Sequence, residues 1–172
     1  MPRLLHLSHR GLMVIIITAS DKSTQNEKKT MDYFFSASFL AVAVAAIVVF
    51  ILLDMLWLAV VARRLYFRQM SYLARIQNGR IVFNLPVGIL AQVIIAAGLA
   101  VFVSLAIMVD NRLVAAAGTG AFAGFVLYCT YDLTNLSFIR DYPLLITVVD
   151  IAWGTFQGLI AGIWVFFLTR LL

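Results

Sequence analysis

The 172-residue sequence has few charged residues and a single cysteine. Charged side chains make up 12% of it, against about a quarter in soluble proteins. Apolar residues make up 63%, and the mean hydropathy is +1.00. A chain this short cannot bury so much apolar surface in its own core, so most of it must face lipid. These shortages exclude a soluble enzyme, a disordered tail and an intrachain disulfide scaffold, since Cys129 has no partner cysteine.

Residues that supply common intramembrane chemistry are also missing from the long apolar segments. Both histidines, His6 and His9, precede these segments, so haem, zinc and imidazole chemistry lack their usual residues there. No lysine lies in these segments to form a Schiff base, and no glycine-rich nucleotide motif is present. We therefore expect no cofactor and no bound metal. An enzyme is disfavoured, although a pair such as Asp132 and Asp150 could activate water.

Four apolar segments are long enough to cross a bilayer as helices, which takes about 20 residues. Backbone groups in lipid find no other partners, so each segment must be helical, and the alternation typical of a membrane barrel is absent. Because most connections are short, we predict an all-α membrane protein, an up-down bundle of four transmembrane helices within residues 31–172. The segments are 34–61, 81–109, 113–136 and 144–168.

Residues 1–30 do not fit this pattern and are treated as a separate N-terminal extension. A basic start precedes a short apolar run, 11–19, and a polar string, 21–30. The segment resembles a signal sequence whose apolar run is too short to span. The alternatives are an upstream extension of a chain whose working start is Met31, which we favour, and a structured extra element.

The loops between the apolar segments differ in positive charge. The first, 62–80, carries five arginines and the third, 137–143, carries one more, whereas the second loop and the C-terminus carry one each. Cytoplasmic loops are enriched in lysine and arginine. If the chain starts at Met31, we predict that 62–80 and 137–143 are cytoplasmic in a bacterial inner membrane; the charges of a retained extension nearly balance the count.

The first loop also shows a helical pattern. Tyr66, Met70 and Leu73 fall at helical spacing, which favours either a short helix in the headgroup layer or a plain connecting loop. We expect the lipid bilayer as partner and no nucleic acid. The anionic headgroups should lie near Arg63, Arg64 and Arg68.

Three of the four segments contain an aspartate that lipid disfavours. An aspartate at mid-bilayer costs about 2.5–3.5 kcal/mol, so such residues usually face a bundle interior or a water-filled cavity. Asp54 and Asp132 lie within about two turns of the ends of their helices, and Asp150 about two turns after its helix begins. At about 1.5 Å per residue, all three should lie at one depth, about 9–12 Å inside the face that carries the arginine loops.

Three carboxyl groups at one depth cannot all be ionised without compensation. They can hold protons, bind a cation, or pair with Arg63, Arg64 or Arg140. They can also act as glue between helices, with each hydrogen bond contributing of order 1 kcal/mol. The sequence leaves these alternatives open.

Other polar residues are expected beside the acids. On the third segment, for example, Tyr128, Asp132 and Asn135 share one face by their helical spacing. Tryptophans follow two of the aspartates three residues later. The predicted binding cluster consists of Asp54, Trp57, Asn84, Gln92, Tyr128, Tyr131, Asp132, Asn135, Asp150 and Trp153.

The fourth segment carries glycines at four-residue intervals after Asp150. Such a stripe lets another helix approach closely, so we expect helix packing there and not a ligand slot. The glycines are Gly154, Gly158 and Gly162.

Three short motifs resemble a known family. The strings LDMLWL at 53–58, YDLTNL at 131–136 and VDIAWG at 149–154 are similar to the signature of a bacterial family of predicted membrane proteins. It is the domain-of-unknown-function family two-one-seven-seven. The resemblance covers about 31–172, and members begin just before the first helix, which supports Met31 as a start. It implies a characteristic site of Asp54, Asp132, Asn135, Asp150 and Trp153, and no substrate.

We expect an integral inner-membrane protein with a polar, acid-lined intramembrane cavity that handles a proton, a cation or a small polar solute. So small a bundle would suit a homo-oligomer. The alternative is an accessory or structural membrane subunit, whose buried aspartates hold helices or a partner subunit together.

Overall fold

The structure is a computed structural model that describes residues 9–172. The first part of the signal-like segment, with His6, lies outside the described residues. The chain divides into two units, Met1–Leu40 and Ala41–Leu172, and each is described by itself.

In the first unit, α1 (His9–Phe34) is one continuous helix. It runs through the polar string 21–30 and continues across the predicted boundary after residue 30. The lysines, glutamate and glutamine of that string have good helix propensity, and its side chains are almost all exposed. At the end of the unit, Phe34 and Phe39 meet edge to face with ring centroids 4.9 Å apart.

Four helices of the described chain are long and apolar enough to cross a membrane. The prediction of an all-α membrane protein with four transmembrane helices is therefore confirmed. The spans are α2 (Ala37–Leu56) with its continuation η1 (Trp57–Val61), α4 (Leu85–Val109), α5 (Leu113–Phe138) and α6 (Leu144–Leu171).

Local hydrogen bonds and residue types explain where several of the helices begin and end. Ser36 Oγ accepts a hydrogen bond from the Phe39 N–H (3.1 Å) and so caps the start of α2. A proline lies in the first turn of α4, where its missing N–H leaves no bond unmade. At its other end, α2 passes into the π-helix η1, in which the Ala62 N–H donates to the Trp57 carbonyl oxygen (2.8 Å). Local π-helical turns are frequent at functional sites.

The arginine-rich first loop contains a helix and a hairpin. The helix α3 (Arg63–Met70) follows η1 after one residue, so of the two alternatives for this loop the structure contains a short helix. Leu73 lies beyond its end. The strands β1 (Ile76–Gln77) and β2 (Arg80–Ile81) pair antiparallel. Asn78 and Gly79 connect them with φ of 50° and 68°, which suits a tight hairpin turn. This hairpin takes up residue 81, so α4 starts later than predicted.

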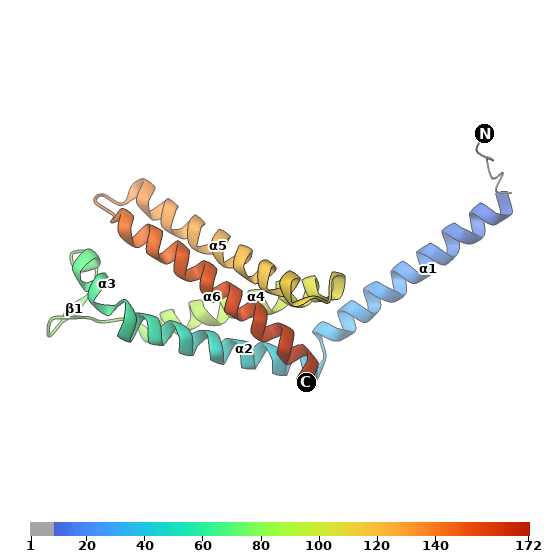
Figure 1. The fold of residues 1–172 in the computed structure, drawn as a ribbon, viewed down its shortest axis with the longest axis horizontal. Coiled ribbons are helices and arrows are strands. Elements are labelled where there is room, and N and C mark those ends of the chain that lie inside the picture. The colour runs from blue at the N-terminus through green and yellow to red at the C-terminus, as the bar shows by residue number, and fades with distance from the viewer. Residues whose placement is uncertain (1–8) are drawn as a thin grey trace. The chain divides into compact units, whose positions relative to one another are not determined.

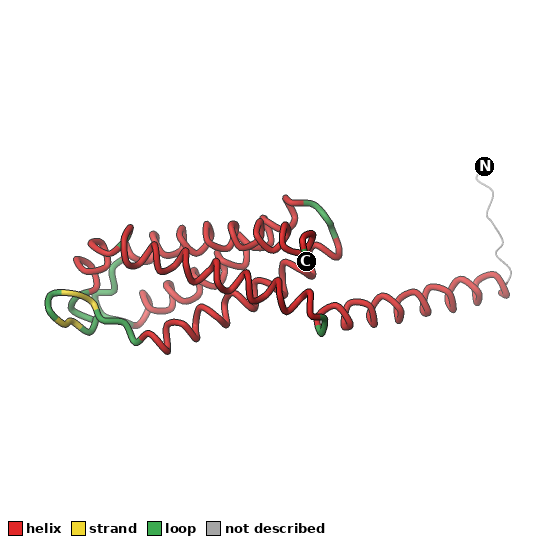
Figure 2. Tube along the Cα trace, turned by 90° about the horizontal axis from the view of Figure 1, so that it is seen from below, coloured by secondary structure: helices red, strands yellow, loops and turns green. Residues whose placement is uncertain are grey.

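In the second unit, loops 62–80 and 137–143 lie at one end, and the loop between α4 and α5 lies with the C-terminus at the other (Figures 1 and 2). The Tyr72 hydroxyl donates to the backbone oxygen of Asp141, which joins the first loop to the third. At the opposite end, Arg170 Nη2 donates to Asn111 Oδ1 (2.7 Å). Ends that alternate in this way are those of an up-down bundle.

The helices α5 and α6 run side by side with their backbones in contact (Figure 1). A Cβ atom on Gly120 would meet the carbonyl oxygen of Gly158, and one on Gly124 would meet that of Gly154. Gly162 packs in the same way against Ala116. The glycine stripe of the fourth segment therefore lies against a second stripe of small residues on α5. The four-residue spacing of that second stripe also indicates close helix packing.

The other helices pack through larger side chains. Phe50 of α2, Ala96 and Leu99 of α4, and Ala161 of α6 form a buried apolar cluster. Outward-facing apolar residues are exposed along the spans, as expected for surfaces that face lipid.

Candidate functional site

Asp54 on α2 is 4% exposed and links three helices. Its Oδ2 accepts a hydrogen bond from Gln92 Nε2 on α4 (2.7 Å), and its Oδ1 accepts one from Trp153 Nε1 on α6 (3.3 Å). The other amide atom, Gln92 Oε1, is buried and has no hydrogen-bond partner among the described residues.

Two stacked tryptophans lie between Asp54 and the acid of α6. The rings of Trp57 and Trp153 are parallel within 5°, with centroids 4.3 Å apart. Trp57 Nε1 donates to the Tyr66 hydroxyl (3.5 Å), and that hydroxyl donates to Asp150 Oδ1. A continuous series of polar and ring contacts therefore runs from Asp54 to Asp150.

Tyr66 attaches the loop helix α3 to the polar interior. Burial, and then the negative charge of Asp150, raises the pKa of Tyr66 above its ordinary value of 10. The hydroxyl therefore keeps its proton at neutral pH and remains a donor to Asp150. Tyr66 was not among the predicted site residues, because a tyrosine in a loop reads as an ordinary interfacial aromatic.

Asp132 on α5 is fully buried, with 0% exposure. Its Oδ1 accepts a hydrogen bond from the Tyr142 hydroxyl (3.0 Å), while Oδ2 is buried with no hydrogen-bond partner in the described part of the chain. Thr147 Oγ1 on α6 is likewise buried with no hydrogen-bond partner in the described part of the chain. Burial, followed by the charge of Asp132, raises the pKa of Tyr142, so this loop tyrosine also stays a donor. Asn135 makes a further polar contact with it.

A third set of contacts crosses the bundle through Tyr128 and Gln157. The Tyr128 hydroxyl donates to Gln157 Oε1 (3.1 Å), and Gln157 Nε2 donates to the Phe50 carbonyl oxygen (3.2 Å). Gln157 is completely buried in an apolar helix. Gln157 is not among the predicted site residues, although the free-energy cost of burial that pointed to the aspartates also applies to a buried amide.

The three acids gather around Tyr128. This ring lies within electrostatic range of Asp54, Asp132 and Asp150. Asp150 in turn interacts electrostatically with the other two carboxyl groups. The structure thus places acids from three spans within electrostatic range of one tyrosine.

None of these acids is ion-paired within the described chain. The ion pair found there joins Arg112 to Asp110 (2.5 Å), in the loop between α4 and α5. The guanidinium of Arg112 lowers the pKa of that exposed aspartate. The described structure therefore does not pair these acids with Arg63, Arg64 or Arg140. Residues 9–172 also contain no group of three metal-ligating acids, histidines or cysteines close enough to hold an ion.

Two predicted residues lie away from this polar cluster. Asn84 is exposed and precedes α4, and Tyr131 is 65% exposed on α5. The polar cluster as the structure has it comprises Asp54, Trp57, Tyr66, Gln92, Tyr128, Asp132, Asn135, Tyr142, Asp150, Trp153 and Gln157.

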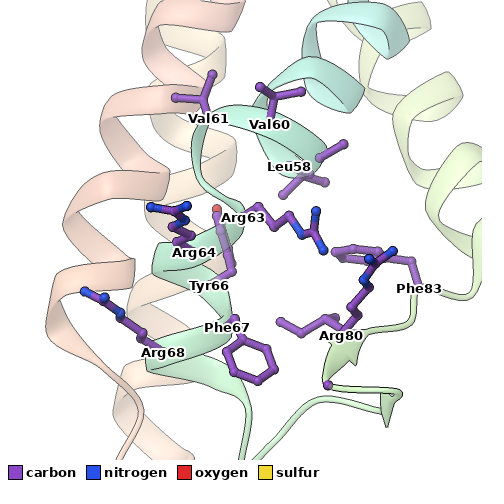
Figure 3. Close-up of a pocket in the computed structure, with 13 residues that line it drawn as sticks. Leu58, Val60, Val61, Arg63, Arg64, Tyr66, Phe67, Arg68, Arg80 and Phe83 are labelled. Carbon is purple, nitrogen blue, oxygen red and sulfur yellow. The ribbon is translucent and has the colours of Figure 1, made fainter.

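A cavity of about 1010 Å³ lies beside the polar cluster, between η1, α3 and the hairpin (Figure 3). None of the three aspartates lines it, so this cavity is not acid-lined. Tyr66 lines it and also bonds Asp150, which makes Tyr66 the connection between cavity and cluster. The charged lining residues are Arg63, Arg64, Arg68 and Arg80.

Comparison with known proteins identifies the family of the chain. No curated protein and no solved structure matches it. The sequence profile of the family described as "Predicted membrane protein (DUF2177)" matches residues 39–167, which include Asp54, Asp132 and Asp150. The resemblance seen in the three motifs is thereby confirmed, and the chain belongs to the DUF2177 family of predicted membrane proteins.

Proposed function

We propose that this multi-pass membrane protein takes up and releases protons at its buried carboxyl groups, and so moves protons, alone or with a small polar solute, between the arginine-bearing end and the bundle interior. The observation that carries the proposal is Asp132 Oδ2, which is buried with no hydrogen-bond partner among residues 9–172. An unpaired carboxylate in apolar surroundings is costly, and a bound proton removes that cost.

The surroundings of the polar cluster favour a proton over a metal cation. Four arginines line the cavity at the end of the first span, and their positive charge repels an approaching inorganic cation. A metal cation must diffuse through the cavity, whereas a proton can pass from one hydrogen-bonded group to the next. Tyr66 offers one such group, since its hydroxyl lies between the cavity and Asp150.

Asparagine at Asp132 should abolish proton movement while the protein still folds, because the amide has the shape of a neutral carboxyl but cannot exchange a proton. The full chain is reconstituted in vesicles that contain a pH-sensitive dye, and a potassium gradient with valinomycin drives proton entry. We expect wild-type protein to acidify the vesicles faster than protein-free vesicles do, and Asp132→Asn to match the protein-free rate.

Asp141→Asn is the matched control. Asp141 is exposed in the third loop with φ of 59°, a conformation that asparagine adopts readily, so this variant should retain wild-type flux. Wild-type protein that gives no flux above protein-free vesicles, or an Asp132→Asn variant with undiminished flux, would overturn the proposal.

The second candidate function is that of an accessory or structural subunit. It is favoured by Asp54, whose two hydrogen bonds join α2 to α4 and α6 without any need for proton exchange. On this alternative, variants of the buried acids lose thermal stability or a co-purifying membrane partner, and vesicles show no flux at all.

We also propose that loops 62–80 and 137–143 face the cytoplasm of a bacterial cell. Counted over residues 31–172, their arginines outnumber those of the other loop and the C-terminus. The Tyr72–Asp141 contact supports a common side for both loops.

A membrane-impermeant maleimide should therefore label Asn111→Cys and not Arg75→Cys in intact cells, both made in a Cys129→Ser background. After the cells are opened, both should label. Labelling of Arg75→Cys alone in intact cells would reverse the orientation.

A further inference from the structure

The arginine-lined cavity contains a pair of converging guanidinium groups. Arg63, at the start of α3, and Arg80, on β2, both reach toward the ring of Phe83 (Figure 3). Arg64 and Arg68 point to the other side of α3. Two arginines from separate elements thus approach one place from different directions.

No acidic side chain balances this pair. The residues that line the cavity include no aspartate or glutamate. In the described part of the chain, neither the Arg63 nor the Arg80 side chain takes part in a hydrogen bond or an ion pair. Two like charges in one cavity repel each other, and an anion bound between them removes the repulsion. A guanidinium group also matches the geometry of a phosphate group and binds two of its oxygens through two parallel hydrogen bonds.

The backbone holds both arginines in place. The tight turn at Asn78 and Gly79 sets the register in which Gln77 faces Arg80, and the Val82 N–H donates to the Arg75 carbonyl oxygen (2.9 Å) to close the hairpin. Arg63 follows the π-helix η1 after one residue. The pair is therefore built on ordered elements, not on a free loop.

Apart from its four arginines and Tyr66, the cavity is lined by apolar residues and glycine, and it lies at the end of a membrane span. Val60 and Val61 end the first span, line the cavity, and are 68% and 62% exposed. Phosphate groups of lipids lie at this depth, directly beyond the acyl chains. A soluble phosphate compound makes no use of such apolar walls, whereas a lipid does.

We propose that Arg63 and Arg80 bind the phosphate group of an anionic phospholipid, with its acyl chains along Val60 and Val61. The ligand chemistry is a phosphate that carries net negative charge, and the apolar wall selects a lipid as its source. The site shares its cavity with the proposed proton path through Tyr66. Lipid retention and proton flux are measured separately, so either proposal can fail without the other.

The test measures lipid retained by the full chain. Purified protein is mixed in detergent with equal amounts of phosphatidylglycerol and phosphatidylcholine, and native mass spectrometry counts the molecules of each that stay bound. We expect wild-type protein to retain phosphatidylglycerol preferentially, and R63Q/R80Q to reduce that preference about tenfold, as expected for the loss of charge-assisted hydrogen bonds. R63K/R80K keeps the charge but loses the planar fork, and should fall between the two.

The matched control is R75Q/R140Q, which removes two arginines from the same end outside the cavity. It should retain the wild-type preference. An equal loss in both double variants would overturn the site, because it would reveal only general attraction by positive charge. Circular dichroism and elution volume verify that each variant folds, and R80Q alone replaces the double variant if that one does not.

A second arm identifies the source of the phosphate. Inorganic phosphate and glycerol phosphate are added at millimolar concentration to the protein with bound phosphatidylglycerol. If the lipid stays bound, the assignment to a lipid is supported. If the soluble anions displace it as well as added lipid does, the lipid source is overturned and the cavity belongs to a soluble phosphate compound.

Discussion

Alanine at Gly120 or Gly124 is expected to lower the free energy of unfolding by about 3 kcal/mol, the upper part of the usual range for overpacking. The added Cβ would meet the carbonyl oxygen of Gly158 or Gly154 on the facing helix. A backbone atom cannot rotate out of the way as a side chain can, so α5 and α6 must separate along part of their contact. Thermal unfolding of the full chain in detergent measures the loss.

Gly118→Ala is the matched control on the same helix. A Cβ atom there meets nothing within 4 Å, so alanine should leave stability unchanged or raise it by up to about 1 kcal/mol through its better helix propensity. If Gly118→Ala and Gly120→Ala unfold at the same temperature, the close backbone contact between α5 and α6 does not form in the protein.

The four spans could be predicted because lipid offers the backbone no hydrogen-bond partners and so restricts its secondary structure. An apolar segment of sufficient length must be helical, and the Tyr72–Asp141 and Arg170–Asn111 contacts follow from short connections. The start of α4 was harder to predict, because Ile81 and its neighbours are apolar yet belong to the hairpin and the link after it. Hydropathy does not separate an apolar strand from the first turn of a span, and the turn at Asn78 and Gly79 was the signal that would have done so.

The acids of the candidate site could also be predicted, since their cost in lipid singles them out. Their partners from loops could not. Tyr66 and Tyr142 reach the polar cluster from outside the spans, and no periodicity indicates that a loop residue folds back onto a helix. The π-helix that follows Asp54 likewise has no sequence signature. Tyr131 shows the opposite error, because it adjoins Asp132 in sequence but points about 100° away around the helix.

Leucine at Asp54 is expected to lower the free energy of unfolding by about 1–2 kcal/mol, as for strong interhelical hydrogen bonds in membranes. Gln92 Nε2 and Trp153 Nε1 would both lose their hydrogen-bond acceptor. The pairing is checked by a double-variant cycle of Asp54→Leu with Gln92→Leu. If the two single effects simply add, Asp54 and Gln92 do not hold α2 and α4 together.

Asparagine at the same position separates the structural role of Asp54 from a role in proton movement. Its carbonyl oxygen can accept from Trp153, and its amide can donate to Gln92 Oε1, the buried atom without a partner, once the Gln92 amide turns over. Asp54→Asn should therefore unfold like the wild type. If Asp54 is only a link between helices, the variant also keeps its proton flux in vesicles. If Asp54 exchanges protons with Asp132 and Asp150, the flux is lost while stability is not.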